Sequence, residues 1–264
     1  MTRRLHKQAV RDAFDRAATS YDSAAAIQRE ICHRLAGFAA AAPCADTPRH
    51  VLDAGCGTGY GLDLLASLCP EAQVLALDFA PGMLRRLAAS RPEGDPALIC
   101  GDLESLPIAC ESLDVVWSSL ALQWCDPALS LAEIARVLRP GGVAWLATLG
   151  PATLWELREA FAVVDDAEHV IRFHPLDRWR EQAADVGFDV IAADAPHVHA
   201  LASDLRHLLH DIKAIGAHSV GSGPRPALTR AGWRRLEACY EAHRRADGLL
   251  PATYDLILLA LRKR

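Results

Sequence analysis

The chain of 264 residues lacks several features that define whole classes of protein. No apolar run reaches the length needed to cross a bilayer, and no internal repeat or low-complexity tract is present. The first residues, Met-Thr-Arg-Arg-Leu-His-Lys-Gln, do not contain the apolar segment of a secretory signal. We therefore expect a cytoplasmic globular protein with no membrane partner.

Paired cysteines are missing too. The eight cysteines are scattered and no Cys-x-x-Cys occurs, which favours their use as small buried apolar residues. His207 and His210 are one helical turn apart, and His197 and His199 alternate as on a strand. Neither pair has a third ligand at suitable spacing, so we expect no metal site.

The most informative segment is residues 51–59, which read Val-Leu-Asp-Ala-Gly-Cys-Gly-Thr-Gly. A short apolar strand ends near Asp53, and the glycines allow a tight turn before a helix. A second apolar strand ends in Asp78, an acid placed to accept both hydroxyls of a ribose. A glycine-rich turn followed by such an acid is typical of a Rossmann-like nucleotide site.

The spacing of the glycines distinguishes between nucleotides. A dinucleotide fingerprint requires glycine at position 60, where this chain has Tyr60. The Gly-x-Gly-x-Gly spacing, with an acid two residues before it, resembles motif I of class I S-adenosylmethionine (SAM) methyltransferases. The resemblance implies SAM as the cofactor.

Apolar strands and amphipathic helices alternate between residues 50 and 200, which predicts a mostly parallel sheet with helices on both faces. We expect strands at 50–54, 73–78, 97–101, 113–119, 142–149 and 188–194, with a final strand at 254–261. Helices are expected at 60–68, 81–90, 127–138 and 176–186. Seven strands with the last inserted beside the sixth would match the class I methyltransferase architecture.

We expect a single domain, 1–264, built in four parts. Residues 1–45 form an N-terminal helical cover, with two helices broken near Ser20-Tyr21-Asp22, and 46–202 form the nucleotide-binding core. Residues 203–248 are helical in pattern where the simple fold needs only a hairpin, so we interpret them as a helical lid insertion over the ligand crevice. Residues 249–264 supply the final strand.

Charge is distributed unevenly along the chain. Residues 51–200 carry 9 Lys/Arg against 22 Asp/Glu, whereas the first fifty carry 8 against 5 and residues 201–264 carry 11 against 6. Basic flanks around an acidic core favour an acidic partner, although solvated helix faces would give the same pattern. The acidic core and the absence of an Asn/Asp-Pro-Pro-Tyr motif argue against a nucleic-acid partner.

Nearly the whole chain resembles the malonyl-acyl-carrier-protein O-methyltransferases of biotin synthesis, the BioC family. The matching runs are 10–22, 118–124, 136–142, 148–158, 169–173, 211–218 and 251–254. Leu-Gln-Trp, Thr-Leu-Gly-Pro-Ala-Thr and Lys-Ala-Ile-Gly-Ala are the most specific of their motifs. Ser219 departs from the family pattern, in which Asn follows Gly-Ala-His.

The resemblance implies methyl transfer from SAM to the free carboxylate of a malonyl thioester, on acyl carrier protein or coenzyme A. A carboxylate is already ionised at pH 7 and needs no general base, so we assign no catalytic residue beyond positioning and desolvation. The residues expected to bind SAM are Tyr21, Asp53, Gly55, Cys56, Gly57, Asp78, Phe79, Met83, Asp102, Leu103, Ser118, Leu120 and Gln123.

Four polar residues in otherwise apolar runs are the candidates for the acceptor: Arg172, Lys213, His218 and Tyr254. Trp124 and Trp155 favour core positions over the acceptor pocket. Two alternatives stay open, a SAM methyltransferase of another small acid or of a quinone ring, and a non-catalytic SAM-binding protein. Intact glycines and acids at the nucleotide site argue against the second.

Overall fold

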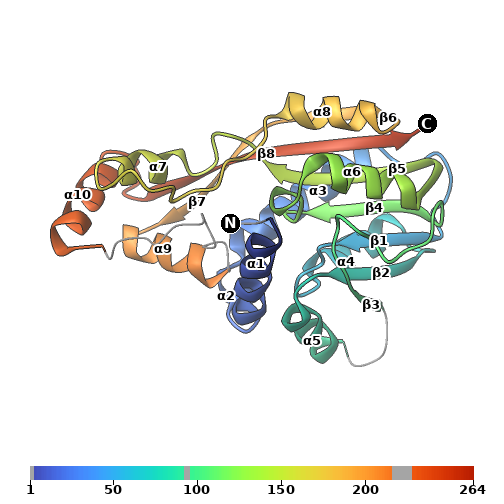
Figure 1. The fold of residues 1–264 in the computed structure, drawn as a ribbon, viewed down its shortest axis with the longest axis horizontal. Helices are drawn as coiled ribbons and strands as arrows, with labels where there is room; N and C mark the ends of the chain where they lie inside the picture. The colour runs from blue at the N-terminus through green and yellow to red at the C-terminus, as the bar shows by residue number, and fades with distance from the viewer. Residues whose placement is uncertain (1–2, 92–95, 216–227) are drawn as a thin grey trace.

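The structure of the chain is a computed structural model that describes residues 3–91, 96–215 and 228–264 (Figure 1). Its centre is an eight-stranded sheet in the order β3-β2-β1-β4-β5-β8-β6, with β7 paired to β8 off this path. The strands are β1 (His50–Ala54), β2 (Gln73–Asp78), β3 (Ala97–Cys100), β4 (Leu113–Ser119), β5 (Leu138–Leu149), β6 (Phe188–Asp194), β7 (His197–Ala202) and β8 (Leu250–Lys263).

The first five strands are parallel to one another, and β8 runs antiparallel between β5 and β6. This order confirms the Rossmann-like α/β fold and the insertion of the last strand beside the sixth. It places the carboxyl ends of β1, β2 and β4 next to one another, which is where ligands bind in open α/β sheets.

Helices cover both faces of the sheet. They are α1 (Arg3–Ala17), α2 (Tyr21–Ala24), α3 (Ala26–Ala41), α4 (Tyr60–Leu68), α5 (Pro81–Ser90), α6 (Pro127–Val137), α7 (Trp155–Ala162), α8 (Leu176–Asp185), α9 (Leu205–Ala214) and α10 (Arg230–Glu241), with a short 3-10 helix, η1 (Leu122–Trp124). Side chains of consecutive strand residues point into the hydrophobic cores on opposite faces of the sheet. Val115 packs with α3 and α4, and Val116 packs with α6 and α8. Burial on both faces explains why these strands read as continuous apolar runs.

One strand more is present than the seven that the sequence predicted. β6 pairs with the second half of β8 and β7 with its first half, and Ala195 and Pro196 interrupt the edge between them. Proline has no N–H to donate to a ladder, so a long edge breaks there into two strands. β8 accordingly begins at Leu250, earlier than expected, to pair with β7.

The helices outside the nucleotide core gather at one end of the molecule. Figure 1 shows α7, α9 and α10 beyond the main sheet, beside β7 and the first half of β8. The N-terminal helices lie between this group and the core: Gly82 N–H on α5 donates to Asp15 on α1, and Ser20 Oγ donates to Ala214 O on α9 at 3.0 Å. The predicted break between two N-terminal helices lies at residues 18–20, and a single turn, α2, follows it.

Two further expectations can be compared with the structure. Cys32, Cys56 and Cys69 are buried as predicted, whereas Cys100 and Cys110 are exposed, so the expectation of burial is wrong for those two. Within the described part of the chain, no helix is both long enough and apolar enough to cross a membrane.

Candidate functional site

The glycine turn after β1 is built by backbone contacts that exclude side chains. Gly55 N–H and Cys56 N–H both donate to Leu77 O on β2, at 2.7 and 2.9 Å. Gly55 has φ +86°, and a Cβ added there would lie 2.2 Å from the Cβ of Ala121. Gly57 has φ +53°, and a Cβ added there would meet nothing within 4 Å. The first glycine is therefore required by packing, while the second faces open space.

Asp78 ends β2 beside this turn and faces a cavity. Its carboxylate accepts from Gly57 N–H at 2.9 Å and from Ala80 N–H at 2.8 Å. Burial raises the pKa of Asp78 to about 6, although the backbone N–H groups act in the opposite direction. Two backbone bonds leave acceptor capacity on a carboxylate, which has about four lone-pair sites. The fixed carboxylate fits the two hydroxyls of a ribose.

Asp53 lies deeper, at 2% exposure, and does not reach the cavity wall. Burial, with a smaller effect of the nearby Asp78 charge, raises the pKa of Asp53 to about 8. A Cβ added to Gly61 would lie 3.2 Å from Asp53 Oδ2, so the first turn of α4 packs directly on this carboxyl group. Its position suits ordering of the turn better than direct ligand contact.

The cavity beside the turn, here the glycine-loop cavity, brings most of the predicted SAM residues together. Those on its wall are Tyr21, Gly55, Gly57, Asp78, Phe79, Met83, Asp102, Leu103 and Leu120. Phe79 and Met83 supply apolar surface, and the absence of a Cβ at Gly57 leaves room for a ligand to approach the main chain. These groups fit SAM in kind: carboxylates for hydroxyls and amines, and apolar side chains for adenine.

Some predicted SAM residues lie elsewhere. Cys56 is buried, and Ser118 is fully buried with its Oγ donating to Ala54 O at 2.7 Å. The neighbouring Ser119 lines the cavity instead, because successive strand side chains point to opposite faces. Gln123 is on the wall of a second cavity, and its amide donates to Leu120 O at 2.6 Å.

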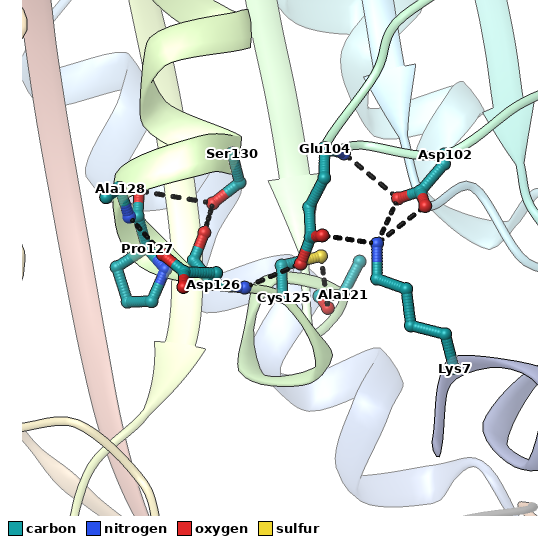
Figure 2. Close-up of polar contacts among 9 residues, drawn as sticks. All are labelled: Lys7, Asp102, Glu104, Ala121, Cys125, Asp126, Pro127, Ala128 and Ser130. Atoms are coloured by element: carbon teal, nitrogen blue, oxygen red, sulfur yellow. Dashed lines mark hydrogen bonds and ion pairs between the residues drawn. The ribbon is translucent and has the colours of Figure 1, made fainter. Parts of the chain in front are cut away.

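The sequence did not identify several residues of the glycine-loop cavity: Lys7, Phe14, Ser119, Ala121, Trp124 and Cys125. Figure 2 shows Lys7 of α1 between Asp102 and Glu104. Lys7 Nζ donates to both Asp102 oxygens at 2.6 Å and lies 2.7 Å from Glu104 Oε2. Asp102, one of the residues expected to bind SAM, therefore has a cation on its carboxylate. Nothing in the sequence around Lys7 indicates that this lysine contacts a carboxylate 95 residues further along the chain.

The second cavity, here the apolar cavity, has a volume of about 250 Å³. Its wall is mostly apolar and comes from α7, the following loop, α9 and β8. Lys213 and Tyr254, two of the predicted acceptor residues, are on this wall with Gln28, Gln123 and His169. Trp155 does not line the apolar cavity. Trp124, for which the sequence favoured a core position, instead lines both cavities.

Arg172 does not reach the apolar cavity. Its side chain is 93% exposed, and Nε donates to Glu168 Oε1 at 3.0 Å. His169 lies closer, since it lines the apolar cavity, pairs with Asp165 Oδ1 at 2.8 Å and stacks on Phe161 at 3.7 Å. The fourth acceptor candidate, His218, lies outside the described residues, as does Ser219.

The two cavities share a wall. Phe14, Tyr21, Leu120 and Trp124 line both. Leu120 follows β4 with φ +57°, a backbone conformation that non-glycine residues rarely adopt. Its N–H donates to Ala147 O at 2.9 Å, which together with the Gln123 bond holds the strained peptide where the cavities meet.

Two tyrosines lie on these walls, Tyr21 on both cavities and Tyr254 on the apolar cavity. Burial raises the pKa of Tyr254 to about 12 and places that of Tyr21 still further above its ordinary value. Both hydroxyls are thus neutral donors at physiological pH.

Comparison with known proteins agrees with this geometry. The family model described as "Methyltransferase domain" matches residues 52–146. The YcgJ protein of Bacillus subtilis has the same fold at 18% identity and a TM-score of 0.60, with 88% of this chain and 99% of that chain covered. Geranyl diphosphate C-methyltransferase of Streptomyces coelicolor A3(2) is similar at 14% identity and a TM-score of 0.53, covering 88% and 80%.

Much closer relatives exist in sequence. The malonyl-[acyl-carrier protein] O-methyltransferase of Dechloromonas aromatica (strain RCB) is 47% identical over 98% of this chain and 96% of its own. That of Laribacter hongkongensis (strain HLHK9) is 46% identical over 95% and 87%. The biotin biosynthesis bifunctional protein BioHC of Cellvibrio japonicus (strain Ueda107) is 40% identical over 98% of this chain and 51% of its own. With a glycine turn and the fixed Asp78 carboxylate at the carboxyl ends of its parallel strands, the chain belongs to the malonyl-[acyl-carrier protein] O-methyltransferase family of SAM-dependent methyltransferases.

Proposed function

We propose that the protein transfers the methyl group of SAM to the free carboxylate of a malonyl thioester carried by acyl carrier protein, giving the methyl ester for biotin synthesis. SAM occupies the glycine-loop cavity and the malonyl group enters the apolar cavity. The names of the relatives support this assignment of donor and acceptor.

The observation that carries the proposal is the shared wall of the two cavities. Methyl transfer is an in-line displacement, so the attacking oxygen and the sulfonium must face each other across the methyl carbon. Tyr21, Leu120 and Trp124 border both cavities and so mark the place where donor and acceptor meet. When bound, SAM supplies a methyl group activated by its positive sulfur.

The chain's own residues position the acceptor rather than activate it. The carboxylate is ionised near neutral pH, and no proton has to be removed. Tyr254 and Tyr21 offer neutral hydroxyl donors, which orient a carboxylate oxygen while leaving it nucleophilic. Lys213 supplies the positive charge that favours a carboxylate over an uncharged acyl group. The apolar wall removes water from the attacking oxygen.

The acyl carrier protein is the partner in this proposal. Carrier proteins are acidic, and the basic residues of this chain are concentrated in the N-terminal fifty and the last sixty-four residues. Those segments contain α1, α3, α9 and α10; Figure 1 shows α9 and α10 at one end of the molecule and α1 between that end and the core. Opposite charges steer association and orient the complex.

The first test is transfer of label from radiolabelled SAM to malonyl-acyl carrier protein, with acetyl-acyl carrier protein as the control. Base-labile label on the malonyl form alone is the expected result. Label on neither form, with SAM binding intact by calorimetry, would rule out this acceptor and return attention to another small acid or a quinone ring.

The Tyr254→Phe variant tests the acceptor site in the same assay. Loss of one neutral hydrogen bond of about 0.5–1.5 kcal/mol raises KM for the malonyl thioester by about 2- to 10-fold. The affinity for S-adenosylhomocysteine stays unchanged because Tyr254 lines only the apolar cavity of the two. Tyr60→Phe is the matched control, since its hydroxyl contacts His33 at 2.8 Å and lines neither cavity. Equal KM in all three proteins would remove Tyr254 from the acceptor site.

A further inference from the structure

Lys7 connects three segments that are far apart in the sequence. Its ammonium group, on α1, contacts the carboxylates of Asp102 and Glu104 in the turn after β3 (Figure 2). Glu104 Oε1 in turn accepts from the N–H of Asp126 at 2.7 Å. Asp126 is the N-cap of α6, where its side chain accepts from Ala128 N–H at 2.9 Å. One lysine thus joins α1, the β3 turn and the start of α6.

The Asp102 carboxylate is held from two directions. Its own turn holds it, since Glu104 N–H donates to Oδ1 at 3.0 Å, and Lys7 holds both oxygens from the opposite side. Burial acts to lower the pKa of Lys7, but its hydrogen bonds to Asp102 and Glu104 outweigh this effect and the pKa rises above its ordinary value. The ammonium group therefore remains charged at any physiological pH.

This network is better protected from solvent than an ordinary surface ion pair. The Lys7 and Glu104 side chains are 20% and 9% exposed, and Asp102 is 40% exposed. Isolated surface pairs contribute little, whereas a charge shared between two carboxylates in a partly buried network contributes more. The contact can therefore affect how α1 is held.

The position of the network is at the edge of the glycine-loop cavity. Lys7 and Phe14 bring α1 onto the cavity wall, opposite Asp102 and Leu103. A ligand that fills this cavity therefore contacts α1 on one side and the turn after β3 on the other. Docking of α1 and binding of the ligand then stabilise each other, because each completes the surface that the other needs.

We propose that Lys7 is a positioning residue of the donor site: it ties α1 across the cavity and orients the Asp102 carboxylate, so that docking of α1 and binding of the donor reinforce each other. The inference rests on the proposed placement of SAM in this cavity, and not on the identity of the acceptor. Lys7 acts through Asp102 and α1 and needs no contact with the reacting atoms.

The test compares Lys7→Met with the unaltered full-length chain, using S-adenosylhomocysteine and calorimetry without any acceptor. We expect Kd to rise about tenfold in Lys7→Met, and Lys7→Arg to recover part of the loss because it keeps the charge. Gln8→Met is the matched control, since Gln8 is exposed on the same helix and bonds only to Asp12 among the contacts described. A Kd for Lys7→Met within twofold of the unaltered chain overturns the proposal.

Amide hydrogen exchange gives a second readout that a purely structural lysine would not change. In the unaltered chain, S-adenosylhomocysteine should slow exchange across residues 8–17 of α1. In Lys7→Met, saturating ligand should leave much of this segment exchanging as in the free protein. Equal protection of α1 in both proteins at saturation contradicts the coupling, even if the affinities differ.

The two proposals fail separately. Ligand binding with the expected Lys7 dependence, but no methylation of malonyl-acyl carrier protein, overturns the proposed acceptor and leaves the donor-site inference intact. Methylation of malonyl-acyl carrier protein, with a Kd in Lys7→Met equal to that of the unaltered chain, overturns the donor-site inference and leaves the proposed acceptor intact.

Discussion

Two carboxyl groups at the glycine turn differ in what they can do because they differ in depth. Asp78 faces the glycine-loop cavity with two backbone N–H groups on its oxygens, whereas Asp53 is enclosed behind the turn. Both have pKa values raised by burial, Asp53 more strongly. Asp78 is therefore placed to bind a ligand, and Asp53 is placed to order the turn. The sequence predicted both as SAM-binding residues.

Replacing Asp78 by Asn should weaken binding of S-adenosylhomocysteine by about 10- to 100-fold. Hydrogen bonds to a charged group contribute about 1.5–3 kcal/mol, and the amide loses both the charge and one acceptor oxygen. Calorimetry measures the effect, and Glu71→Gln, an exposed acid outside both cavities, is the control. A variant that binds as well as the control, with an unchanged melting temperature, would show that Asp78 does not hold the ribose.

Asp53 should make the ligand-free protein less stable as the pH rises. Its pKa is about 8 in the folded state against an ordinary value of 3.8, so the folded protein holds an extra proton between these values. The free energy of unfolding then falls with increasing pH across that window, and the raised pKa of Asp78 acts in the same direction.

Urea unfolding at pH 5, 6, 7 and 8 measures this dependence. The isosteric Asp53→Asn variant cannot ionise, so its stability should fall less steeply over the same range, with Glu71→Gln again as the control. The explanation is wrong if Asp53→Asn and the unaltered chain lose stability at the same rate.

At the scale of elements, the turn between β1 and α4 separates folding from binding. Gly55 lies against Ala121 on the chain that follows β4, whereas Gly57 faces open space. The same substitution at the two positions should therefore have different consequences.

Gly55→Ala should destabilise the fold by about 2–4 kcal/mol, because overpacking adds to the cost of a left-handed backbone. Gly57→Ala should cost only about 1 kcal/mol in stability and reduce the affinity for S-adenosylhomocysteine by more than tenfold, since its methyl group enters the ligand space. Thermal melts and calorimetry on both variants provide the comparison. The reverse pattern, with Gly57→Ala as the less stable protein, would contradict this assignment.

Helix α7, beside the apolar cavity, is held to β8 by hydrogen bonds. Glu156, at the first turn of α7, is 1% exposed and accepts from the Thr253 N–H at 3.1 Å and from the Thr253 hydroxyl. Trp155 Nε1 donates to the same hydroxyl at 3.2 Å, which accounts for its position outside the apolar cavity. These bonds fix α7, whose Leu157 and Phe161 line that cavity.

At the scale of the whole molecule, charge separates the nucleotide core from the segments around it. Residues 51–200 are acidic, and the flanks are basic. If the flanks receive an acidic carrier protein, raising NaCl from about 50 to 300 mM should raise KM for malonyl-acyl carrier protein several-fold, because the Debye length falls below about 10 Å.

Malonyl-N-acetylcysteamine, a small thioester without the carrier protein, is the control for salt effects on the site itself. Its KM should change less than twofold over the same range. An equal response of the two acceptors would argue against electrostatic docking of the carrier protein.

The sequence alone determined the core of the fold and the cofactor class. Strands 50–54, 73–78, 113–119 and 188–194 have the bounds that were expected. Apolar runs bounded by glycine, proline and acids are local signals, and a turn that needs positive φ favours glycine in any context. The Gly-x-Gly-x-Gly spacing is also a local signal, and its resemblance to motif I indicated SAM before any coordinates. The role of Asp78 at the ribose stays a prediction.

Only the tertiary structure decided what lies against these motifs. Lys7 meets Asp102 across 95 positions of sequence, Trp124 reaches both cavities, and Arg172 turns outward to Glu168. Helical periodicity shows which face of a segment is apolar, but it does not show which partner covers that face. Contacts between distant side chains depend on how the helices dock, and that docking is settled by packing of the whole core.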